Sequence, residues 1–293
     1  MARGLTAGPS AAMKILVTGA GGMLGSEFMQ APQGHTTVGI GRAVLDVSNP
    51  AALRSAVAAH HPDIVVNCAA DTDVEGAEKR PEEVFAANAM LPEILALACN
   101  DAGATLVQIS STGCYGAWKN SPYVEDDPLQ PTTVHHKAKA QGEAAVQAHA
   151  KSWMIVRTGW LYGAAFGSSK NFVRRRLEEA SANPVMLADA SQHGNPTFAG
   201  DVSTQTYKLL AEGQRGIFNC VARGSASRLD YVRAIVEASG IACDVQGSPP
   251  GHFRRAAAVS FNETAHDVHL DALNMNIMPE WRPALQNYVR RLL

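Results

Sequence analysis

The 293-residue chain has little of what marks several broad classes of protein. Its 25 Lys and Arg residues are balanced by 27 Asp and Glu residues, for a net charge of −2. A nucleic-acid-binding protein usually carries a clear basic excess or a basic stripe. The chain also has no apolar stretch near the ~20 residues that a membrane span needs. The sequence therefore indicates no nucleic-acid partner and no membrane partner.

Cysteine is scarce as well, and its spacing argues against two kinds of structural site. The five cysteines are odd in number and no two form a CxxC pair, so neither a disulfide framework nor a zinc knuckle is expected. His266 and His269 could share a helical face, but no third ligand is nearby and an exposed pair is the better interpretation. We expect no metal site and a reducing, cytoplasmic location.

The sequence does contain a regular alternation of short apolar runs and helical patterns. Strands are predicted over residues 14–18, 36–40, 63–68, 105–110 and 153–158. Helices are predicted over residues 22–30, 49–60, 81–101 and 135–150. This alternation predicts an α/β fold built on a doubly wound parallel sheet of the Rossmann type.

After residue 158 the alternation becomes irregular and turn-rich stretches appear, which indicates a smaller C-terminal substrate lobe. We expect the dinucleotide-binding domain to take residues 13–165 and roughly 198–222, and the substrate-binding lobe to take 166–197 and 223–293. Residues 1–12 lack the apolar centre of a secretory signal and are expected to form a disordered lead.

A glycine-rich turn follows the first predicted strand. Gly19, Gly22 and Gly25 are spaced three apart, and Met23 and Leu24 open the helix that follows. Glycine allows the tight turn and a close approach of the backbone to a pyrophosphate, which the helix N-terminus then binds. This context favours a dinucleotide site over the alternative, an ordinary strand-to-helix turn that tolerates glycine.

The end of the second predicted strand bears on which dinucleotide binds. An acidic residue there would accept the ribose 2′-hydroxyl of NAD, whereas Arg42 can pair with a 2′-phosphate. Asp46 lies beyond the expected strand end and is poorly placed for the hydroxyl. Arg42 therefore favours NADP, with NAD and an exposed loop arginine as the open alternatives.

Several short motifs along the chain together match the pattern of one family. They are TGAGGMLG (18–25), LDV (45–47), VNCAADTDVEGAE (66–78), ISS (109–111), PYVEDD (122–127), KAQGE (139–143), RTGWLYG (157–163), NFV (171–173) and GNPT (194–197). With these motifs the chain resembles the extended short-chain dehydrogenases/reductases, and most closely the dTDP-4-dehydrorhamnose reductase family. The resemblance runs from about residue 13 to the C-terminus.

The resemblance implies a reaction and three catalytic positions. The family reduces the 4-keto group of a nucleotide-linked 6-deoxyhexose with NAD(P)H and uses a Thr or Ser, a Tyr and a Lys. By position, Ser111 would polarise the carbonyl and Lys139 would hold the nicotinamide ribose. The tyrosine position, four residues before the lysine, is occupied by His135. That spacing places His135 and Lys139 on one helical face.

The histidine at the tyrosine position leaves two interpretations open. Imidazole can also donate a proton, but Lys139 and an oxidised nicotinamide would lower its pKa. At pH 7 it would then be mostly neutral, which makes it a poorer acid but still an N–H donor. The alternative is a degenerate site in which His135 is an exposed helix residue. If His135 is not the acid, Tyr115 and Asp71 are the next candidates.

The remaining site residues are also assigned by resemblance. The cofactor set adds Asp46, Val47, Ala69 and Ala70, and the sugar-binding set is Thr72, Val74 and Trp160. Asp71, where the family has an aromatic residue, could contact the substrate, supply a base or be a tolerated loop residue. Arg254 and Arg255 could bind a nucleotide diphosphate through paired hydrogen bonds, or could be solvated surface.

The sequence thus predicts an NADP-dependent reductase of a nucleotide-linked 4-keto-6-deoxy sugar or a related keto substrate. The alternative is a non-catalytic NADP-binding protein, a regulatory or partner subunit on the same fold, because a fold does not fix an activity. Ser111 and Lys139 favour the enzyme, and His135 is the departure. A homo-oligomer stays open.

Overall fold

The computed structural model describes residues 12–30, 34–163, 171–249 and 251–293, apart from the side chain of Arg42. The strands are β1 (Lys14–Thr18), β2 (Thr36–Ile40), β3 (Ile64–Asn67), β4 (Thr105–Ser111), β5 (Trp153–Thr158), β6 (Leu161–Tyr162), β7 (Val185–Ala188), β8 (His193–Gly194), β9 (Thr197–Phe198), β10 (Gly216–Asn219), β11 (Ala226–Ser227) and β12 (Asp244–Gly247). The α-helices are α1 (Met23–Gln30), α2 (Pro50–Ala59), α3 (Val74–Ala77), α4 (Pro81–Phe85), α5 (Leu91–Ala102), α6 (Val134–His149), α7 (Phe172–Ala182), α8 (Ala199–Ala211), α9 (Arg228–Ser239), α10 (Val268–Ala272) and α11 (Trp281–Leu292). Three short helical segments complete the description, namely η1 (Arg42–Val44), η2 (Ala86–Met90) and η3 (Thr112–Tyr115).

The central sheet has six parallel strands in the order β10-β5-β4-β3-β1-β2, which confirms the predicted fold class. β1, β2 and β5 have the bounds expected from the sequence, whereas β10 is not among the predicted strands. From β1 the chain adds β2 on one side and then β3, β4 and β5 on the other, so the strand order reverses between β1 and β3. In open parallel sheets the ligand crevice lies outside the carboxyl ends of the strands at such a switch point.

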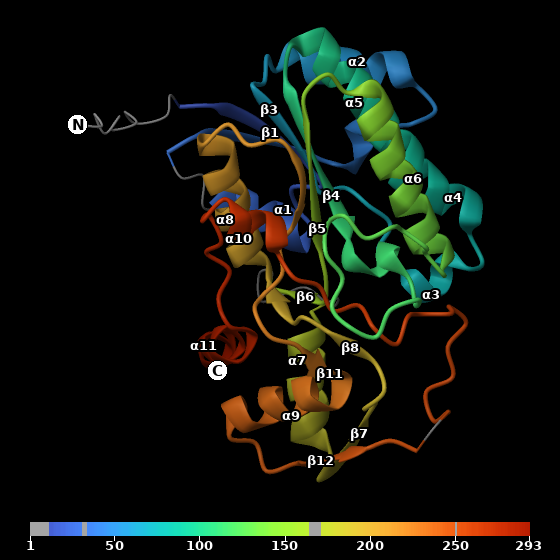
Figure 1. Ribbon diagram of the computed structural model, residues 1–293, viewed down its shortest axis with the longest axis vertical. Helices are drawn as coiled ribbons and strands as arrows, with labels where there is room; N and C mark the ends of the chain where they lie inside the picture. The colour runs from blue at the N-terminus through green and yellow to red at the C-terminus, as the bar shows by residue number, and fades with distance from the viewer. Residues whose placement is uncertain (1–11, 31–33, 164–170, 250) are drawn as a thin grey trace.

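Helices cover both faces of this sheet (Figure 1). Since side chains alternate along a strand, Ile15 and Val17 join the core beneath α1, α8 and α10, while Leu16 joins the core beneath α2, α5 and α6. The Tyr207 hydroxyl on α8 donates a hydrogen bond to the Phe28 carbonyl on α1, at 2.7 Å. Both faces are therefore buried, as the continuous apolar runs of the strands require.

Below the sheet in Figure 1 lies a smaller body made of α7, α9, α11 and the paired strands β7 and β12. Its aromatic core includes Trp160, Tyr162, Tyr231 and Tyr288. The expected division into two domains stays a prediction. Its boundary near residue 165 and nearly all of the expected lead, 1–12, lie outside the described residues.

Part of the C-terminal segment belongs to the core beneath the sheet. Leu270, Met275 and Met278 pack there, although the sequence assigned them to the lobe.

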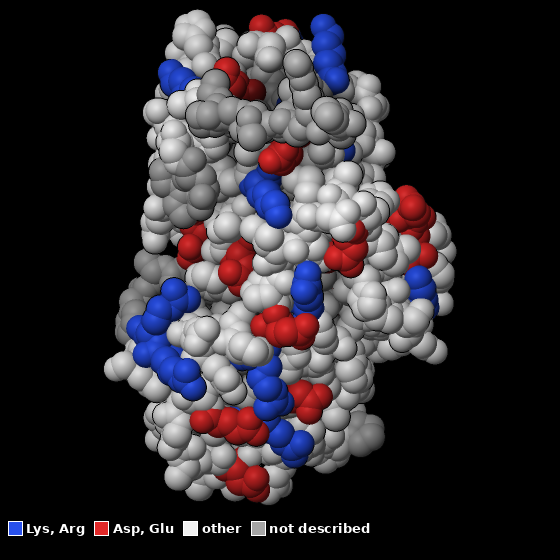
Figure 2. Space-filling view, turned by 60° about the vertical axis from the view of Figure 1, so that its left-hand side comes forward, with Lys and Arg blue, Asp and Glu red and all other residues white. Residues whose placement is uncertain are grey.

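The surface carries charges of both signs. On the face shown in Figure 2, acidic and basic side chains are interspersed. In the described ranges, no helix has both the length and the apolar character to cross a bilayer.

The long helix predicted over residues 81–101 is interrupted. α4 passes into the π-helical segment η2 before α5 begins. Pro92 has no N–H to donate to the Asn88 carbonyl four residues earlier, and the Leu91 N–H bonds the Ala86 carbonyl five residues back. Such π-helical turns occur often at functional sites, and this one brings Asn88 toward the carboxyl edge of the sheet.

Candidate active site

The carboxyl edge of the sheet is held by a row of buried polar side chains. The Thr18 hydroxyl at the end of β1 donates to Asn67 Oδ1 on β3, at 2.6 Å. Asn67 Nδ2 in turn donates to Gln108 Oε1 on β4, at 2.8 Å. These bonds fix the ends of three neighbouring strands relative to one another, and the loops that follow them start from a rigid edge.

The glycine-rich turn has the geometry that a bound dinucleotide needs. Gly19 has a φ of +64°, and a Cβ there would lie 2.8 Å from the Ala69 nitrogen. A Cβ on Gly25 would overlap the Gly19 carbonyl. Nothing lies within 4 Å of the Cβ position of Gly21, so the turn presents open backbone at the start of α1. This open cradle fits a pyrophosphate at a helix N-terminus.

The predicted cofactor residues around this turn differ in what they can offer. The Leu24 side chain is buried in the core beside Phe28, which leaves only its backbone for a ligand, and Met23 is half-buried. Ala69 follows β3, and its N–H lies 3.2 Å from Asn67 Oδ1. Ala70, beside it, is half-buried.

The end of β2 holds the residues expected to meet the adenosine. Asp46 is exposed, and hydrogen bonds from the Ser48 hydroxyl and N–H lower its pKa. Val47 is half-buried against the core beneath α2. Arg42 begins η1, directly after β2, and its side chain lies outside the described structure.

Three predicted catalytic residues come from two elements that touch. Ser111 ends β4, and its hydroxyl accepts a hydrogen bond from the Gly113 N–H at 3.2 Å, which caps η3. Lys139, on α6, donates from Nζ to the Ile109 carbonyl at 2.8 Å. The ring of His136 packs against Gly113 so closely that a Cβ there would overlap it. α6 is therefore docked against the end of β4.

His135 is 5% exposed, which overturns the alternative of an exposed helix residue. Its Nδ1 lies 3.4 Å from Nδ2 of Asn88. Burial, together with the neighbouring His136 and Lys139, lowers the pKa of His135 to about 3. The imidazole is therefore neutral at pH 7 and acts as a hydrogen-bond donor or acceptor.

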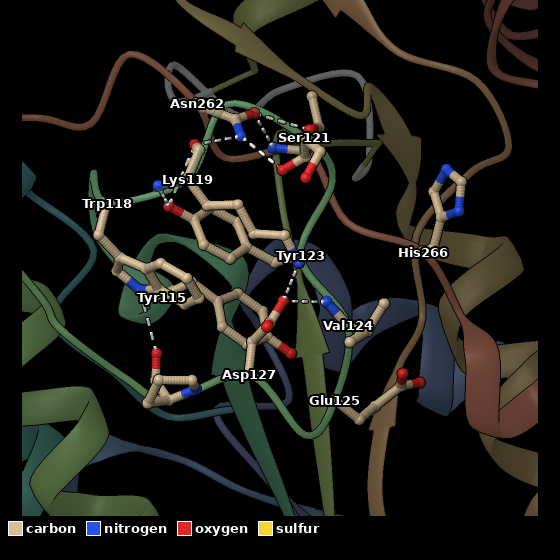
Figure 3. Close-up of polar contacts among 12 residues, drawn as sticks. Tyr115, Trp118, Lys119, Ser121, Tyr123, Val124, Glu125, Asp127, Asn262 and His266 are labelled. Carbon is tan, nitrogen blue, oxygen red and sulfur yellow. Dashed lines mark hydrogen bonds and ion pairs between the residues drawn. The ribbon is translucent and has the colours of Figure 1, made fainter.

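The surroundings of Tyr115 argue against its prediction as a substitute acid. Its hydroxyl donates to Asn219 Oδ1 at 2.8 Å and accepts from Arg157 Nη1 at 3.0 Å. Its ring is stacked on that of Tyr123 (Figure 3), and the two ring centroids are 4.9 Å apart. Burial raises the pKa of Tyr115. The residue instead helps to anchor the loop that carries the PYVEDD motif. Just before this motif, the Lys119 and Ser121 carbonyls accept hydrogen bonds from Asn262 Nδ2.

The Asp71 carboxylate is engaged within its own loop. Oδ2 lies 2.9 Å from Arg80 Nη1, and Oδ1 accepts from the Asp73 N–H at 3.0 Å. Burial raises the pKa of Asp71, but the hydrogen bonds from Asp73 and Arg80 and the charge of Arg80 outweigh it, and the net pKa is lowered. The carboxylate is thus an ionised loop anchor, and a role as base stays a prediction only.

A cavity of about 470 Å³ adjoins this loop and contains the predicted sugar-binding residues. It is lined by Thr72, Asp73, Val74, Glu75, Trp160, Leu161, Phe172, Arg175, Arg228, Tyr231 and Arg255. Its walls come from the loop after β3 and from the smaller body, so the ligand would be enclosed between them. Three of the lining side chains are arginines, which suits an anionic ligand.

Trp160 is held firmly in the wall of this cavity. Its backbone has a φ of 45°, and its Nε1 donates to Glu263 Oε2 at 2.9 Å. The Arg228 guanidinium carbon lies 3.4 Å from the ring centroid, and Trp160 is only 9% exposed. A pyranose could stack on this face of the ring only in the place of Arg228.

Comparison with known proteins places this site in a family. The family described as the RmlD substrate binding domain matches residues 13–293. The chain belongs to this family. It is 35% identical to a dTDP-4-dehydrorhamnose reductase of Mycolicibacterium smegmatis, over 95% of this chain and 85% of that protein.

Two solved structures of this kind share the fold over nearly the whole chain. A dTDP-4-dehydrorhamnose reductase of Clostridium acetobutylicum has a TM-score of 0.91 and 30% identity, over 96% of this chain and 99% of that one. One from Bacillus anthracis, in complex with NADP, has a TM-score of 0.91 and 26% identity, over 96% and 99%. The resemblance predicted from the motifs is confirmed.

Sequence reasoning missed several residues of the site. Asn88, Arg80 and Glu263 are held against predicted site residues by tertiary contacts, and Arg228 reaches the cavity from the start of α9. For Asn88 alone a signal existed, namely the proline four residues later that breaks the helix. In the described ranges, no three His, Cys, Asp or Glu side chains gather to hold a metal ion.

Proposed function

We propose that this RmlD-family protein is an NADPH-dependent reductase of the 4-keto group of a dTDP-linked 6-deoxyhexose. One observation carries the proposal. The buried pair His135 and Lys139 lies on α6, which is docked against the end of β4, while the loop after β3 packs against Gly19 of the glycine turn and also lines a cavity with three arginines. The names of the relatives and the NADP in the Bacillus anthracis structure support the substrate and the cofactor.

Each side chain has a role that follows from its position. Lys139 is the buried cation that would hold the nicotinamide ribose, in exchange for its bond to Ile109. Ser111 and His135 would donate hydrogen bonds to the oxygen of the keto group and stabilise the negative charge that develops there. When bound, NADPH supplies the hydride for the reduction.

The cavity arginines would bind the diphosphate of the substrate. Arg228 uses Nε for a 3.3 Å hydrogen bond to Gln192 and stacks over Trp160. Arg255 lies 3.7 Å from Glu75 across the cavity. Guanidinium groups bind phosphate oxygens in pairs, so Arg175, Arg228 and Arg255 are the proposed diphosphate ligands. Arg254, which does not line the described cavity, is left as solvated surface.

The test is turnover of a dTDP-4-keto-6-deoxyhexose by the purified chain with NADPH, followed by NADPH absorbance and by mass spectrometry of the product. We expect NADPH oxidation and a product two mass units heavier. His135→Ala should lower kcat by ~10²–10³, the loss of one preorganised donor, and leave NADPH affinity nearly unchanged. Tight NADPH binding without turnover of any carbonyl substrate would support the non-catalytic alternative instead.

The same proposal implies a reducing compartment such as the cytoplasm. All five cysteines are free, and three of them are buried. Free thiols persist where glutathione and thioredoxin keep them reduced.

A further inference from the structure

Asn88 is a buried amide that joins the predicted catalytic histidine to the loop after β3. It is 2% exposed and lies in the π-helical segment η2. Across α6, the Asn88 carbonyl is so close to Gly142 that a Cβ there would overlap it. The backbone of Asn88 is thus held against the helix that carries His135.

The orientation of the Asn88 amide is determined by two backbone groups. Its Oδ1 accepts a hydrogen bond from the Asp71 N–H at 2.9 Å. Its Nδ2 donates to the Asp71 carbonyl, also at 2.9 Å. In a flipped amide, Nδ2 would face the Asp71 N–H and Oδ1 would face the Asp71 carbonyl, so both hydrogen bonds would be lost. The nitrogen must therefore be the atom that lies 3.4 Å from His135 Nδ1.

This geometry favours one tautomer of the histidine. Nδ2 has a second N–H, and a protonated Nδ1 opposite it would place two donors against each other. We propose that Asn88 is a positioning residue that keeps His135 as the neutral Nε2–H tautomer, so that Nε2–H is the donor to the keto oxygen. The inference deepens the proposed function and rests on it.

The charged and titratable groups around His135 agree with a neutral ring. His136 and Lys139, on α6, both disfavour a further positive charge, and burial acts in the same direction. Asp71, from the loop after β3, favours the charged form in two ways, through a hydrogen bond between its backbone carbonyl and the ring and through its carboxylate, which is paired with Arg80. The ring therefore polarises the keto group as a hydrogen-bond donor and keeps its proton. In this proposal, water supplies the proton that neutralises the alkoxide.

The experiment reads the tautomer directly and needs neither cofactor nor substrate. In ¹⁵N-histidine-labelled protein, long-range proton–nitrogen correlation distinguishes the two ring nitrogens, and His135→Gln assigns the signal. We expect a protonated Nε2 and an unprotonated Nδ1 at pH ~7, unchanged down to pH ~5. A protonated Nδ1, or a charged ring, in the wild type would overturn the proposal whether or not the chain is a reductase.

Asn88→Asp tests the amide itself, because a carboxylate oxygen opposite Nδ1 accepts a hydrogen bond and so favours a protonated Nδ1. We expect the NMR signal to report either a neutral ring with its proton on Nδ1 or a ring that is charged. We also expect kcat to fall by ~10²–10³, the loss of one preorganised donor, with KM little changed. Asn88→Ser, which keeps a donor, should retain the wild-type tautomer. If the aspartate variant does not fold, the tautomer of the wild type remains the test.

Asn100→Asp is the matched control. Asn100 also accepts from one backbone N–H, that of Lys151 at 2.8 Å, and donates to one carbonyl, that of His149 at 2.7 Å, with no imidazole in contact with its amide in the described structure. It should leave both the His135 signal and kcat unchanged. An Asn88→Asp variant with the wild-type tautomer and wild-type kcat would overturn the positioning role.

Discussion

At position 135, the exchange of a phenol for an imidazole reverses the effect of the neighbouring lysine. A cation one helical turn away stabilises a phenolate, but it opposes a second positive charge on an imidazolium. Because His135 is also buried, its pKa falls to about 3. The side chain at this position is therefore a neutral hydrogen-bond donor, where a tyrosine would have been an acid with a lowered pKa.

This burial makes the stability of the chain depend on pH through one residue. The histidine of the unfolded chain has a pKa near ~6.5. Below that pH the unfolded chain therefore binds a proton at His135, whereas the folded chain does not. The free energy of unfolding should therefore fall as the pH is lowered through this value toward the folded pKa of about 3. Between pH ~7.5 and ~5.5 the loss from His135 should be about 1.4 kcal/mol.

His135→Gln removes the titrating group and serves as the comparison. Urea unfolding of both proteins at the two pH values measures the difference. Parallel pH dependence in the wild type and the variant would show that His135 is solvated or charged in the folded state.

At the scale of elements, α6 is joined to β5 by a buried ion pair whose partners come from the KAQGE and RTGWLYG motifs. Arg157 Nη2 lies 2.7 Å from Glu143 Oε2, and the two side chains are 4% and 1% exposed. Arg157 Nη1 also donates to Tyr115 and to the Glu125 carbonyl. The pair thus fixes the helix that carries His135 and Lys139 against the sheet and η3.

Glu143→Gln should destabilise the fold by ~3–5 kcal/mol, because it leaves a buried guanidinium without its counter-charge. Chemical denaturation measures this cost. Asp101→Asn is the control, since the Arg54–Asp101 pair is over 40% exposed at both side chains and should cost at most ~1 kcal/mol. Equal costs for the two variants would mean that the buried pair does not hold α6 in place.

The strand-to-helix turn offers a second comparison between two neighbouring glycines. Gly25→Ala places a methyl group on the Gly19 carbonyl, so α1 must move away from the turn. We expect a loss of ~1–3 kcal/mol in stability and of most cofactor affinity. Gly21→Ala meets nothing within 4 Å and should keep the stability of the wild type. Thermal unfolding and NADPH titration of both variants decide, and equal behaviour would refute the assigned turn.

At the scale of the whole molecule, the C-terminal segment ties the two bodies together around the cavity. Glu75, beside the sheet, accepts hydrogen bonds from the Ala256 and Ala257 N–H groups at 2.8 and 3.2 Å. Asn262 donates to the loop that carries the PYVEDD motif (Figure 3). Since both bodies line the cavity, a ligand there stabilises the folded chain as a unit.

Cofactor choice should be visible in the stability of the chain, because a ligand that binds only the folded state stabilises that state. At ~100 times its Kd, a ligand adds about 2.7 kcal/mol to the free energy of unfolding. We expect NADPH to raise Tm more than NADH at equal concentration, and Arg42→Ala to narrow that difference. Arg54→Ala, at the exposed pair with Asp101, is the control. Equal shifts with both cofactors in the wild type would contradict the preference assigned to Arg42.

The sequence by itself determined the parallel sheet, the glycine turn, the family and the spacing of His135 and Lys139. These follow from local patterns, since apolar runs, glycine spacing and a helical repeat are properties of adjacent residues. The bounds of β1, β2 and β5 could be predicted for the same reason. Only the tertiary structure decided the burial of His135, the engagement of Asp71 by Arg80 and the stacking of Arg228 on Trp160. The partners in these contacts are distant in sequence or come from different elements, and burial and charge pairing depend on what the rest of the chain brings to the same place.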